Sequence, residues 1–383
     1  MSASEKRPVL LVTNDLGPRA GGIESFILGL LGELNGHEVA IYTSSQDGDL
    51  AFDNELHRRY GVIVYRDKSR ILLPTPRVNR AVATIMKKHS STIIWYGAAA
   101  PLGWMSGYLR RNGAKRQVAL THGHEVWWSR VWPFSWVMRR ITKNLDVITY
   151  LGEFTHQAMK PILSKKVQAV RVAPGIAINH FTPGARSGLL IEKLKVADKK
   201  IIISVGRLVH RKGQDRLIEA MPEILRDVPN TLLLLVGEGP YRNHLESLVK
   251  KYSLGESVRF VGRLKYDELP EYLRLGNLFA MPSRSRFFGL EVEGLGIVYL
   301  EASSAGLPVI GGASGGAPDA VLDGESGLVV DGTNVRAIAQ AAISLLNDPE
   351  CAAAMGARGR EWVLEEWSWA LWGERFTTLL FGK

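Results

Sequence analysis

Cysteine is nearly absent from the sequence: Cys351 is the only one among 383 residues. A single cysteine excludes an internal disulfide and is typical of a reducing compartment. Residues 90–109 carry no charge, but Pro101 and three glycines interrupt them, which favours a strand and a loop over a membrane span. The first residues lack the apolar stretch of a signal peptide, so we expect a cytoplasmic protein that is not integral to a bilayer.

Acidic side chains are scarce relative to basic ones, with 38 aspartates and glutamates against 48 lysines and arginines. The formal net charge of +10 indicates an acidic partner, which can be nucleic acid, anionic lipid or a phosphorylated small molecule. Signatures of RRM, KH and zinc-finger domains are missing, so we expect no nucleic-acid partner. The P-loop GxxxxGK[ST] is missing too, and GEGPYR at 237–242 lacks the third glycine of a dinucleotide fingerprint.

Both halves of the chain alternate short apolar segments with amphipathic ones. A chain of 383 residues is longer than one hydrophobic core normally supports, so two domains are expected. The alternation predicts the α/β class, with a parallel sheet wound on both sides in each domain. We expect an N-terminal Rossmann-like domain over 1–180, a linker over 181–200, a C-terminal Rossmann-like domain over 201–365 and a C-terminal helix over 366–383. The predicted strands are PVLLVTN, EVAIYTS, GVIVYR, STIIWYG, QVALTHG and DVITYLG in the first half, and IIISVG, TLLLLVG, VRFVG, NLFAMPS and LPVIGG in the second.

A cluster of cations follows one of these strands. The apolar run 201–205 leads into GRLVHRKG, which contains Arg207, His210, Arg211 and Lys212. Open α/β sheets bind their ligands at the carboxyl ends of the strands, so the cluster predicts an anion site there. The alternative is an ordinary solvated loop.

A second informative stretch is SRFFGLEVEGLGIVYLEASSAGLPVIGG, in which Glu293 and Glu301 lie eight positions apart. A helix is expected to begin just after the GLG between them. A helix N-terminus offers free N–H groups, and glycines let a ligand approach the main chain. Glu301, about one turn inside the helix, can accept two hydroxyls of a ribose or sugar. The alternatives are a glutamate that only complements the helix dipole and a glycosidase carboxylate pair, although two groups beside one helix start do not easily flank a glycosidic bond.

These stretches carry a resemblance. VGRLVHRKG, LLLVGEGP, VRFVGRL and EGLGIVYLEASSAGLPVIGG, in this order, resemble family 4 of the retaining glycosyltransferases, and AGG at 20–22 resembles the family's N-terminal glycine loop. Within the family, the chain most resembles the actinobacterial phosphatidylinositol mannoside mannosyltransferases. The resemblance implies the GT-B fold, with two Rossmann-like domains facing each other across a cleft and a C-terminal helix packed on the N-terminal domain. It implies transfer of an α-linked hexose, mannose from GDP-mannose, to a phosphatidylinositol mannoside or related glycolipid.

The resemblance also implies roles for individual residues. Arg207 and Lys212 match the cationic pair that grips the donor diphosphate, and Glu301 matches the glutamate that binds the ribose. Glu293 matches the residue that holds the donor sugar. The other matched positions are Gly294, Leu295, Gly296 and Ile297, whose main chain holds the distal phosphate; Gly21 and Gly22, in the loop that closes over the phosphates; Arg263 and Leu264, at the base pocket; His122, a catalytic histidine near the transferred sugar and the acceptor; and Asp15, at the acceptor.

The same resemblance suggests how the reaction proceeds. Fixed cations and helix N–H groups stabilise the negative charge that develops on the leaving diphosphate, so we expect neither a metal nor another cofactor. Retention without an enzymic nucleophile resembles front-face transfer. The alternatives are a family 4 enzyme that uses a UDP-sugar and a soluble acceptor, a GT-B epimerase or phosphorylase, and a non-catalytic lipid-binding protein on this scaffold.

Two basic stretches predict peripheral contact with an anionic membrane, at the inner face of the plasma membrane. EVWWSRVWPFSWVMRRITK combines four tryptophans with four cations, a composition suited to a lipid interface. RVNRAVATIMKKH places Arg77, Arg80, Lys87 and Lys88 around an apolar stripe. The alternative for both stretches is that the apolar side chains pack inside the protein.

Overall fold

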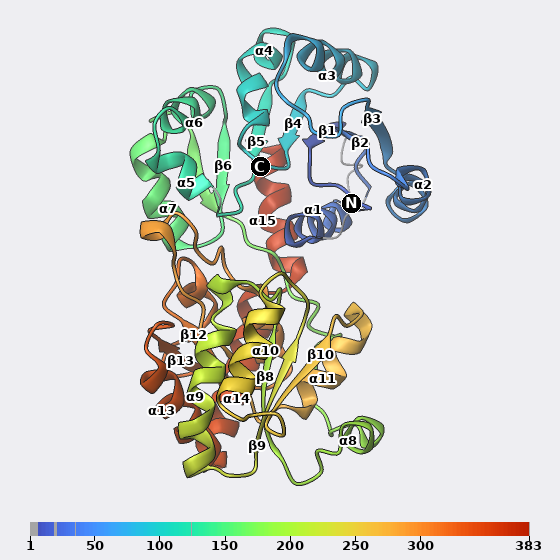
Figure 1. The fold of residues 1–383 in the computed structure, drawn as a ribbon. Coiled ribbons are helices and arrows are strands. Elements are labelled where there is room, and N and C mark those ends of the chain that lie inside the picture. Colours follow the sequence, from blue (N-terminus) through green and yellow to red (C-terminus); the bar gives the residue numbers. More distant parts are fainter. Residues whose placement is uncertain (1–6, 19–20, 35, 124, 383) are drawn as a thin grey trace. The chain divides into compact units, whose positions relative to one another are not determined.

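The computed structural model describes residues 7–18, 21–34, 36–123 and 125–382. These residues form two compact units (Figure 1). Unit 1 comprises the chain up to Gly175 together with the residues from Trp369 onward, and unit 2 comprises Ile176–Ser368. The segment 181–200, expected to link the domains, lies within unit 2 and includes helix α8 (Gly188–Leu194).

The described residues of unit 1 form a seven-stranded sheet whose neighbouring strands are all parallel. The order β3-β2-β1-β4-β5-β6-β7 changes direction at β1, as in a Rossmann fold. The strands are β1 (Val9–Thr13), β2 (Val39–Ser44), β3 (Ile63–Asp67), β4 (Ile93–Tyr96), β5 (Arg116–Ala119), β6 (Val147–Tyr150) and β7 (Gln168–Arg171). The helices are α1 (Gly22–Glu33), α2 (Asp49–Tyr60), α3 (Pro76–Lys88), α4 (Ser106–Arg111), α5 (Glu125–Arg130), α6 (Phe134–Thr142), α7 (Glu153–Met159) and α15 (Trp369–Phe381), with short 3-10 turns η1 (Leu102–Met105) and η2 (Lys160–Ile162).

The described residues of unit 2 form a six-stranded parallel sheet in the order β10-β9-β8-β11-β12-β13. The strands are β8 (Lys200–Val205), β9 (Thr231–Val236), β10 (Val258–Gly262), β11 (Leu278–Met281), β12 (Val309–Gly312) and β13 (Gly327–Val330). The helices besides α8 are α9 (Gln214–Asp227), α10 (Arg242–Lys251), α11 (Leu269–Leu275), α12 (Ile297–Ser304), α13 (Val335–Asn347) and α14 (Pro349–Glu366), with 3-10 turns η3 (His210–Lys212), η4 (Tyr266–Glu268), η5 (Phe287–Gly289) and η6 (Ala317–Ala320).

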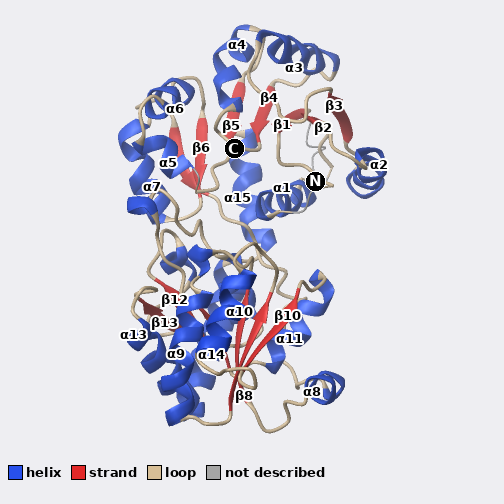
Figure 2. Ribbon diagram, in the orientation of Figure 1, coloured by secondary structure: helices blue, strands red, loops and turns tan. Residues whose placement is uncertain are grey.

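The central strands of both units are buried on both faces. Every residue of β1 and of β9 is buried, and helices lie on either side of each sheet (Figure 2). A parallel strand covered in this way is apolar throughout instead of alternating, which is why runs such as TLLLLV identify it. The doubly wound α/β class predicted from the sequence is therefore confirmed.

Two strands lie outside the predicted set, β7 and β13. Each is the last strand at one edge of its sheet, and each is only partly buried. QAVR in particular has too little apolar character to be identified as a strand. The uncharged stretch 90–109 forms β4, η1 and α4, as expected for a segment that does not span a membrane.

Helix α15 belongs to unit 1 although it follows the whole of unit 2 in sequence. It lies against α1 and β4, where the Phe376 ring packs 4.9 Å from the Trp95 ring, centroid to centroid. Both side chains are fully buried, as is Trp372. The prediction that the C-terminal helix packs on the N-terminal domain is thus confirmed.

Candidate functional site

The turn after β8 carries the cationic cluster. Lys212, the last residue of η3, is buried, and its Nζ lies 2.9 Å from Oε2 of Glu293. Arg211 Nε lies 3.7 Å from the same oxygen. Glu293 is also buried, so this ion pair is held in a low-dielectric setting where removal of either partner is costly. The structure brings together two predicted site residues, Lys212 and Glu293, and adds Arg211, which belongs to the predicted cationic cluster but has no individual role in the prediction.

Arg207 lies at the start of the same turn but differs from Lys212. Its side chain is exposed, and none of the ion pairs among the described residues includes it. A guanidinium in this state can meet an incoming anion without first breaking an internal contact.

The turn is supported by a buried network that sequence reasoning missed. The Arg284 guanidinium donates to both carboxylate oxygens of Asp215, at 2.7 and 2.6 Å, and lies 3.0 Å from the His210 ring. The Arg284 main-chain N–H donates to the Arg211 carbonyl at 2.8 Å. Burial alone would raise the pKa of Asp215, but the Arg284 guanidinium holds it below its usual value. Burial and then Arg284 lower the pKa of His210. The network fixes the backbone that presents Arg211 and Lys212.

The turn from Glu293 to Gly296 requires glycine for a steric reason. Gly296, directly before α12, has φ of +82°, and a Cβ there would lie 2.4 Å from the Tyr299 ring. The Tyr299 hydroxyl donates to the Met281 carbonyl at 2.6 Å, which ties the first turn of α12 to the end of β11. The N–H groups of residues 294–296 donate to no residue in the described part of the chain.

Two further glycines pack against this turn, and the prediction did not include them. The Gly316 N–H donates to the Glu293 carbonyl at 2.9 Å. A Cβ on Gly315 would lie 2.3 Å from that same oxygen, and one on Gly316 would lie 2.2 Å from the Gly294 carbonyl oxygen. The loop after β12 therefore holds the main chain around Glu293 at a distance that only glycines allow. The repeated glycines of GGASGG were the available signal.

Glu301 lies about one turn inside α12, as predicted. Its carboxylate accepts no hydrogen bond from a described residue, and burial raises its pKa to about 7. The pKa of Tyr266 is raised by burial and by the charge of Glu301, so the phenol and the carboxylate are close neighbours. Arg263 and Leu264 follow β10, three and two residues before Tyr266. The Arg263 side chain is exposed and Leu264 is half-buried.

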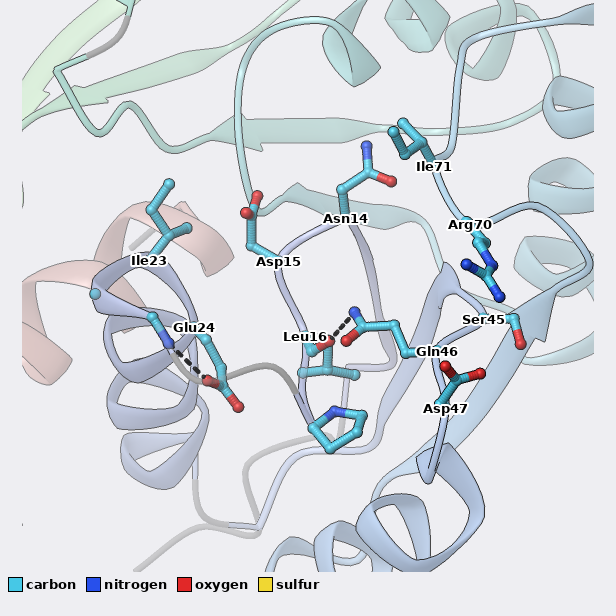
Figure 3. Close-up of a pocket in the computed structure, with 13 residues that line it drawn as sticks. Asn14, Asp15, Leu16, Ile23, Glu24, Ser45, Gln46, Asp47, Arg70 and Ile71 are labelled. Atoms are coloured by element: carbon cyan, nitrogen blue, oxygen red, sulfur yellow. Dashed lines mark hydrogen bonds between the residues drawn. The ribbon is translucent and has the colours of Figure 1, made fainter. Parts of the chain in front are cut away.

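In unit 1, a pocket of about 860 Å³ opens at the carboxyl end of β1 (Figure 3). Asp15 lies on its wall together with Gly21 and Gly22, the first of which precedes α1. The pocket is lined by Asn14, Asp15, Leu16, Pro18, Gly21, Gly22, Ile23, Glu24, Ser45, Gln46, Asp47, Arg70 and Ile71. The Gly21 N–H donates to Glu24 at 3.1 Å (Figure 3). Ala20, the first residue of the AGG segment, lies outside the described residues.

The two glycines differ from Gly296 in what surrounds them. A Cβ added to either Gly21 or Gly22 would meet no atom of a described residue within 4 Å. Packing among the described residues of unit 1 therefore does not require glycine at these positions.

His122 lies beyond β5 in unit 1 and is not among the residues that line this pocket. Its Nε2 is 2.5 Å from the Gly97 carbonyl oxygen, and its main-chain N–H donates to Glu125 at 2.9 Å. The Phe26 ring contacts the imidazole edge-on, with centroids 5.8 Å apart. The structure holds the imidazole in a defined orientation.

The two basic stretches expected at a membrane have different environments. In α3 the apolar stripe, which includes Val82, is buried in the core, and Arg77 pairs with buried Asp67 at 2.7 Å. This stripe is therefore not available to a membrane. In the tryptophan stretch, Trp127 and Trp128 are half-buried and pack on Phe134.

Trp132 and Trp136, in contrast, are 80% and 54% exposed.

None of the helices in the described part of the chain combines the length and the apolar character of a transmembrane span. Within that part, no three His, Cys, Asp or Glu side chains gather to hold a metal ion. Metal independence of the activity stays a prediction.

Two units, each with a parallel sheet in Rossmann order, have the architecture of the GT-B fold class. The solved structures that match over nearly the whole chain agree. A sucrose-phosphate synthase from Thermosynechococcus elongatus superposes with a TM-score of 0.81 at 25% identity, covering 98% of both chains. A glycosyltransferase from Rickettsia africae gives a TM-score of 0.82 at 18% identity, covering 99% of both chains.

Sequence comparison is more specific. The family model described as Glycosyltransferase Family 4 matches residues 20–177, and Glycosyl transferases group 1 matches residues 190–362. The GDP-mannose-dependent alpha-(1-6)-phosphatidylinositol monomannoside mannosyltransferase of Mycolicibacterium smegmatis is 42% identical, covering 98% of both chains. The GDP-mannose-dependent monoacylated alpha-(1-6)-phosphatidylinositol monomannoside mannosyltransferase of Corynebacterium glutamicum is 40% identical, covering 99% of both. The chain belongs to family 4 of the glycosyltransferases.

Proposed function

We propose that this protein transfers mannose from GDP-mannose to a phosphatidylinositol mannoside, with retention of the α configuration. The observation that carries the proposal is the 42% identity, over 98% of both chains, to a mannosyltransferase with this donor and acceptor class. The Lys212–Glu293 pair beside an open helix start supports it, because it supplies the groups that a sugar nucleotide requires.

The donor diphosphate binds at the turn after β8. Lys212 and the exposed Arg207 contact the phosphate oxygens, and the N–H groups of residues 294–296 hold the distal phosphate. Glu293 orients Lys212 and accepts hydroxyls of the donor sugar. Arg211, 3.7 Å from Glu293, adds positive charge at the same place.

The nucleoside lies along α12 and the end of β10. The Glu301 carboxylate, which has no partner among the described residues, accepts the two ribose hydroxyls. Arg263 and Leu264 meet the guanine base. Ligand hydroxyls that donate to Glu301 stabilise its ionised form, which burial disfavours in the free protein.

The reaction breaks the bond between the sugar C1 and the diphosphate oxygen, and a new bond joins C1 to an acceptor hydroxyl oxygen. Negative charge accumulates on the leaving GDP, where Arg207, Lys212 and the free N–H groups are already in place. The acceptor hydroxyl proton passes to the leaving phosphate on the same face, which preserves the configuration at C1. His122 orients the transferred sugar, and no metal ion is required.

The acceptor headgroup binds in the pocket of unit 1. Asp15 accepts hydroxyls of the acceptor, and Arg70 on the same wall suits its phosphodiester. Gly21 and Gly22 leave room for a ligand in this pocket. Because the acceptor is a lipid, the protein works at the cytoplasmic face of the membrane as a peripheral protein.

The test uses purified protein, radiolabelled GDP-mannose and vesicles that contain phosphatidylinositol monomannoside. We expect a radiolabelled lipid that carries one more mannose than the acceptor, and an α-mannosidase should release this mannose. Lys212→Ala should lose the product, whereas Lys250→Ala, on the exposed face of α10, should retain it. Transfer from a UDP-sugar but not from GDP-mannose would refute the proposal that GDP-mannose is the donor. No transfer from any sugar nucleotide would refute the proposal that the protein is a glycosyltransferase.

A further inference from the structure

A second pocket of unit 1, of about 380 Å³, lies between α6 and the segment 161–164 and is separate from the pocket with Asp15. Its α6 wall consists of Trp136, Arg139, Arg140 and Lys143, which recur at intervals of three and four along one side of the helix. We call it the α6 pocket.

The second wall of the α6 pocket is fixed to the helix by a buried hydroxyl. Thr142 Oγ1 donates to the Ile162 carbonyl at 3.1 Å and accepts from the Ser164 N–H at 3.2 Å. Thr142 itself is buried. The hollow therefore has two walls in a defined arrangement, unlike a gap between independent surface side chains.

Uncompensated positive charge surrounds the α6 pocket. Arg139, Arg140 and Lys143 are exposed, and their side chains form no ion pair with any residue that the structure describes. The segments 134–143 and 160–166 contain six lysines and arginines and no aspartate or glutamate. Cations near a helix C-terminus also complement the helix dipole, but that effect does not call for three of them, nor for Lys160, Lys165 and Lys166, which flank the second wall in sequence. The charge is complementary to an anionic surface.

Exposed tryptophans accompany this charge. Trp136 is 54% exposed and its ring lies 5.7 Å from that of Trp104, which is 37% exposed. Trp132, just before α6, is 80% exposed. Large aromatic side chains are normally buried, and exposed tryptophans beside arginines are typical of a membrane interface, where the indole sits at headgroup depth.

We propose that the α6 pocket docks the protein on an anionic phospholipid bilayer. The phosphate of one lipid headgroup binds among Arg139, Arg140 and Lys143, while Trp132 and Trp136 enter the interfacial layer. This contact is distinct from the donor and acceptor sites, so it fails or survives independently of the proposed transfer reaction.

The experiment measures flotation of the purified protein with vesicles, in the absence of any sugar nucleotide. Vesicles of phosphatidylcholine are compared with vesicles of phosphatidylcholine mixed with phosphatidylglycerol. Binding to the anionic vesicles alone, weakened by added salt, is expected. A cation at an anionic surface changes partitioning by about fivefold, so Arg139→Gln/Arg140→Gln/Lys143→Gln should bind about a hundredfold more weakly.

A matched variant separates this site from net charge. Lys193→Gln/Lys250→Gln/Lys251→Gln removes three exposed lysines of unit 2 and lowers the formal net charge equally. It should retain vesicle binding within about twofold, because none of these lysines lines the α6 pocket. Equal losses in both triple variants would overturn the proposal, since binding would then follow total charge.

A second variant tests the aromatic part. Trp132→Ala/Trp136→Ala keeps the cations and should weaken binding most clearly at high salt, where screening suppresses the electrostatic part. Both pocket variants should keep wild-type turnover on a deacylated, water-soluble acceptor, which also shows that they fold. Wild-type vesicle binding by the pocket triple variant, together with that turnover, would refute the proposal.

Discussion

The substitution Glu301→Gln tests two effects of the buried carboxylate separately: its cost to the stability of the protein and its contribution to nucleotide binding. In the folded protein the pKa of Glu301 is about 7, against 4.5 for an ordinary glutamate. The folded state therefore binds the proton more tightly than the unfolded chain does, and stability is lost as the pH rises between these two values. At about 1.36 kcal/mol for each pH unit, the gap corresponds to about 3 kcal/mol of unfolding free energy once the pH exceeds 7.

Removing the charge should return that free energy. We expect Glu301→Gln to be more stable than the wild type by up to about 3 kcal/mol near pH 8, with the difference disappearing below about pH 4.5. Denaturant unfolding at a series of pH values measures it. Glu365→Gln makes the same chemical change at an exposed position of α14 and serves as the control. A Glu301→Gln variant no more stable than this control near pH 8 would refute the burial argument.

The same substitution should weaken nucleotide binding. Hydrogen bonds to a charged group are worth about 1.5–3 kcal/mol, so calorimetry should show GDP bound at least tenfold more weakly. In the wild type only the ionised carboxylate binds ribose well, so GDP affinity should fall about tenfold for each pH unit below the pKa. Glu301→Gln should lose this pH dependence. Unchanged GDP affinity in the variant would show that Glu301 does not hold the ribose.

Three further substitutions test the site. Arg207→Ala removes an exposed cation and should lower kcat by a factor of about a hundred or more, with little change in the free energy of unfolding. Lys212→Ala should lower kcat as well, and it should also cost about 3–5 kcal/mol of stability because it leaves Glu293 buried and unpaired. Steady-state kinetics and denaturant unfolding distinguish the two, and equal stabilities would contradict the ion-pair argument. In Gly22→Ala the added methyl group has open space around it, so the stability of the protein should stay the same or rise, while the KM for the donor should increase. A clearly destabilised variant would refute this description of the loop.

The sequence was sufficient for the strands that lie inside each sheet. Runs such as VLLVT and TLLLLV are apolar because both faces of the strand are covered, and that pattern is local. Partial cover does not by itself hide an edge strand, because GVIVYR and VRFVG identify the edge strands β3 and β10. QAVR of β7 has too little apolar character to be identified, whereas GLVV of β13 is apolar but only four residues long. Helix periodicity, in turn, indicates an apolar face without saying what covers it. For α3 the cover is the core of unit 1, which the pattern of RVNRAVATIMKKH does not reveal.

The candidate site shows the same division. Lys212 and Glu293 are predictable because each lies in a distinctive local motif, and the structure places them 2.9 Å apart. The support from Asp215 and Arg284 is not predictable in this way, since the two residues are 69 positions apart and join only when β8 and β11 pair. A contact that depends on strand pairing leaves no trace in local spacing.

The placement of α15 has a consequence for how the protein is made. Unit 1 completes its core only with residues 369–381, which leave the ribosome after every residue of unit 2. During translation Trp95 lacks its aromatic neighbour Phe376 until the almost two hundred residues of unit 2 have been synthesised. The core of unit 1 is therefore completed late in biosynthesis, only after unit 2 has been made.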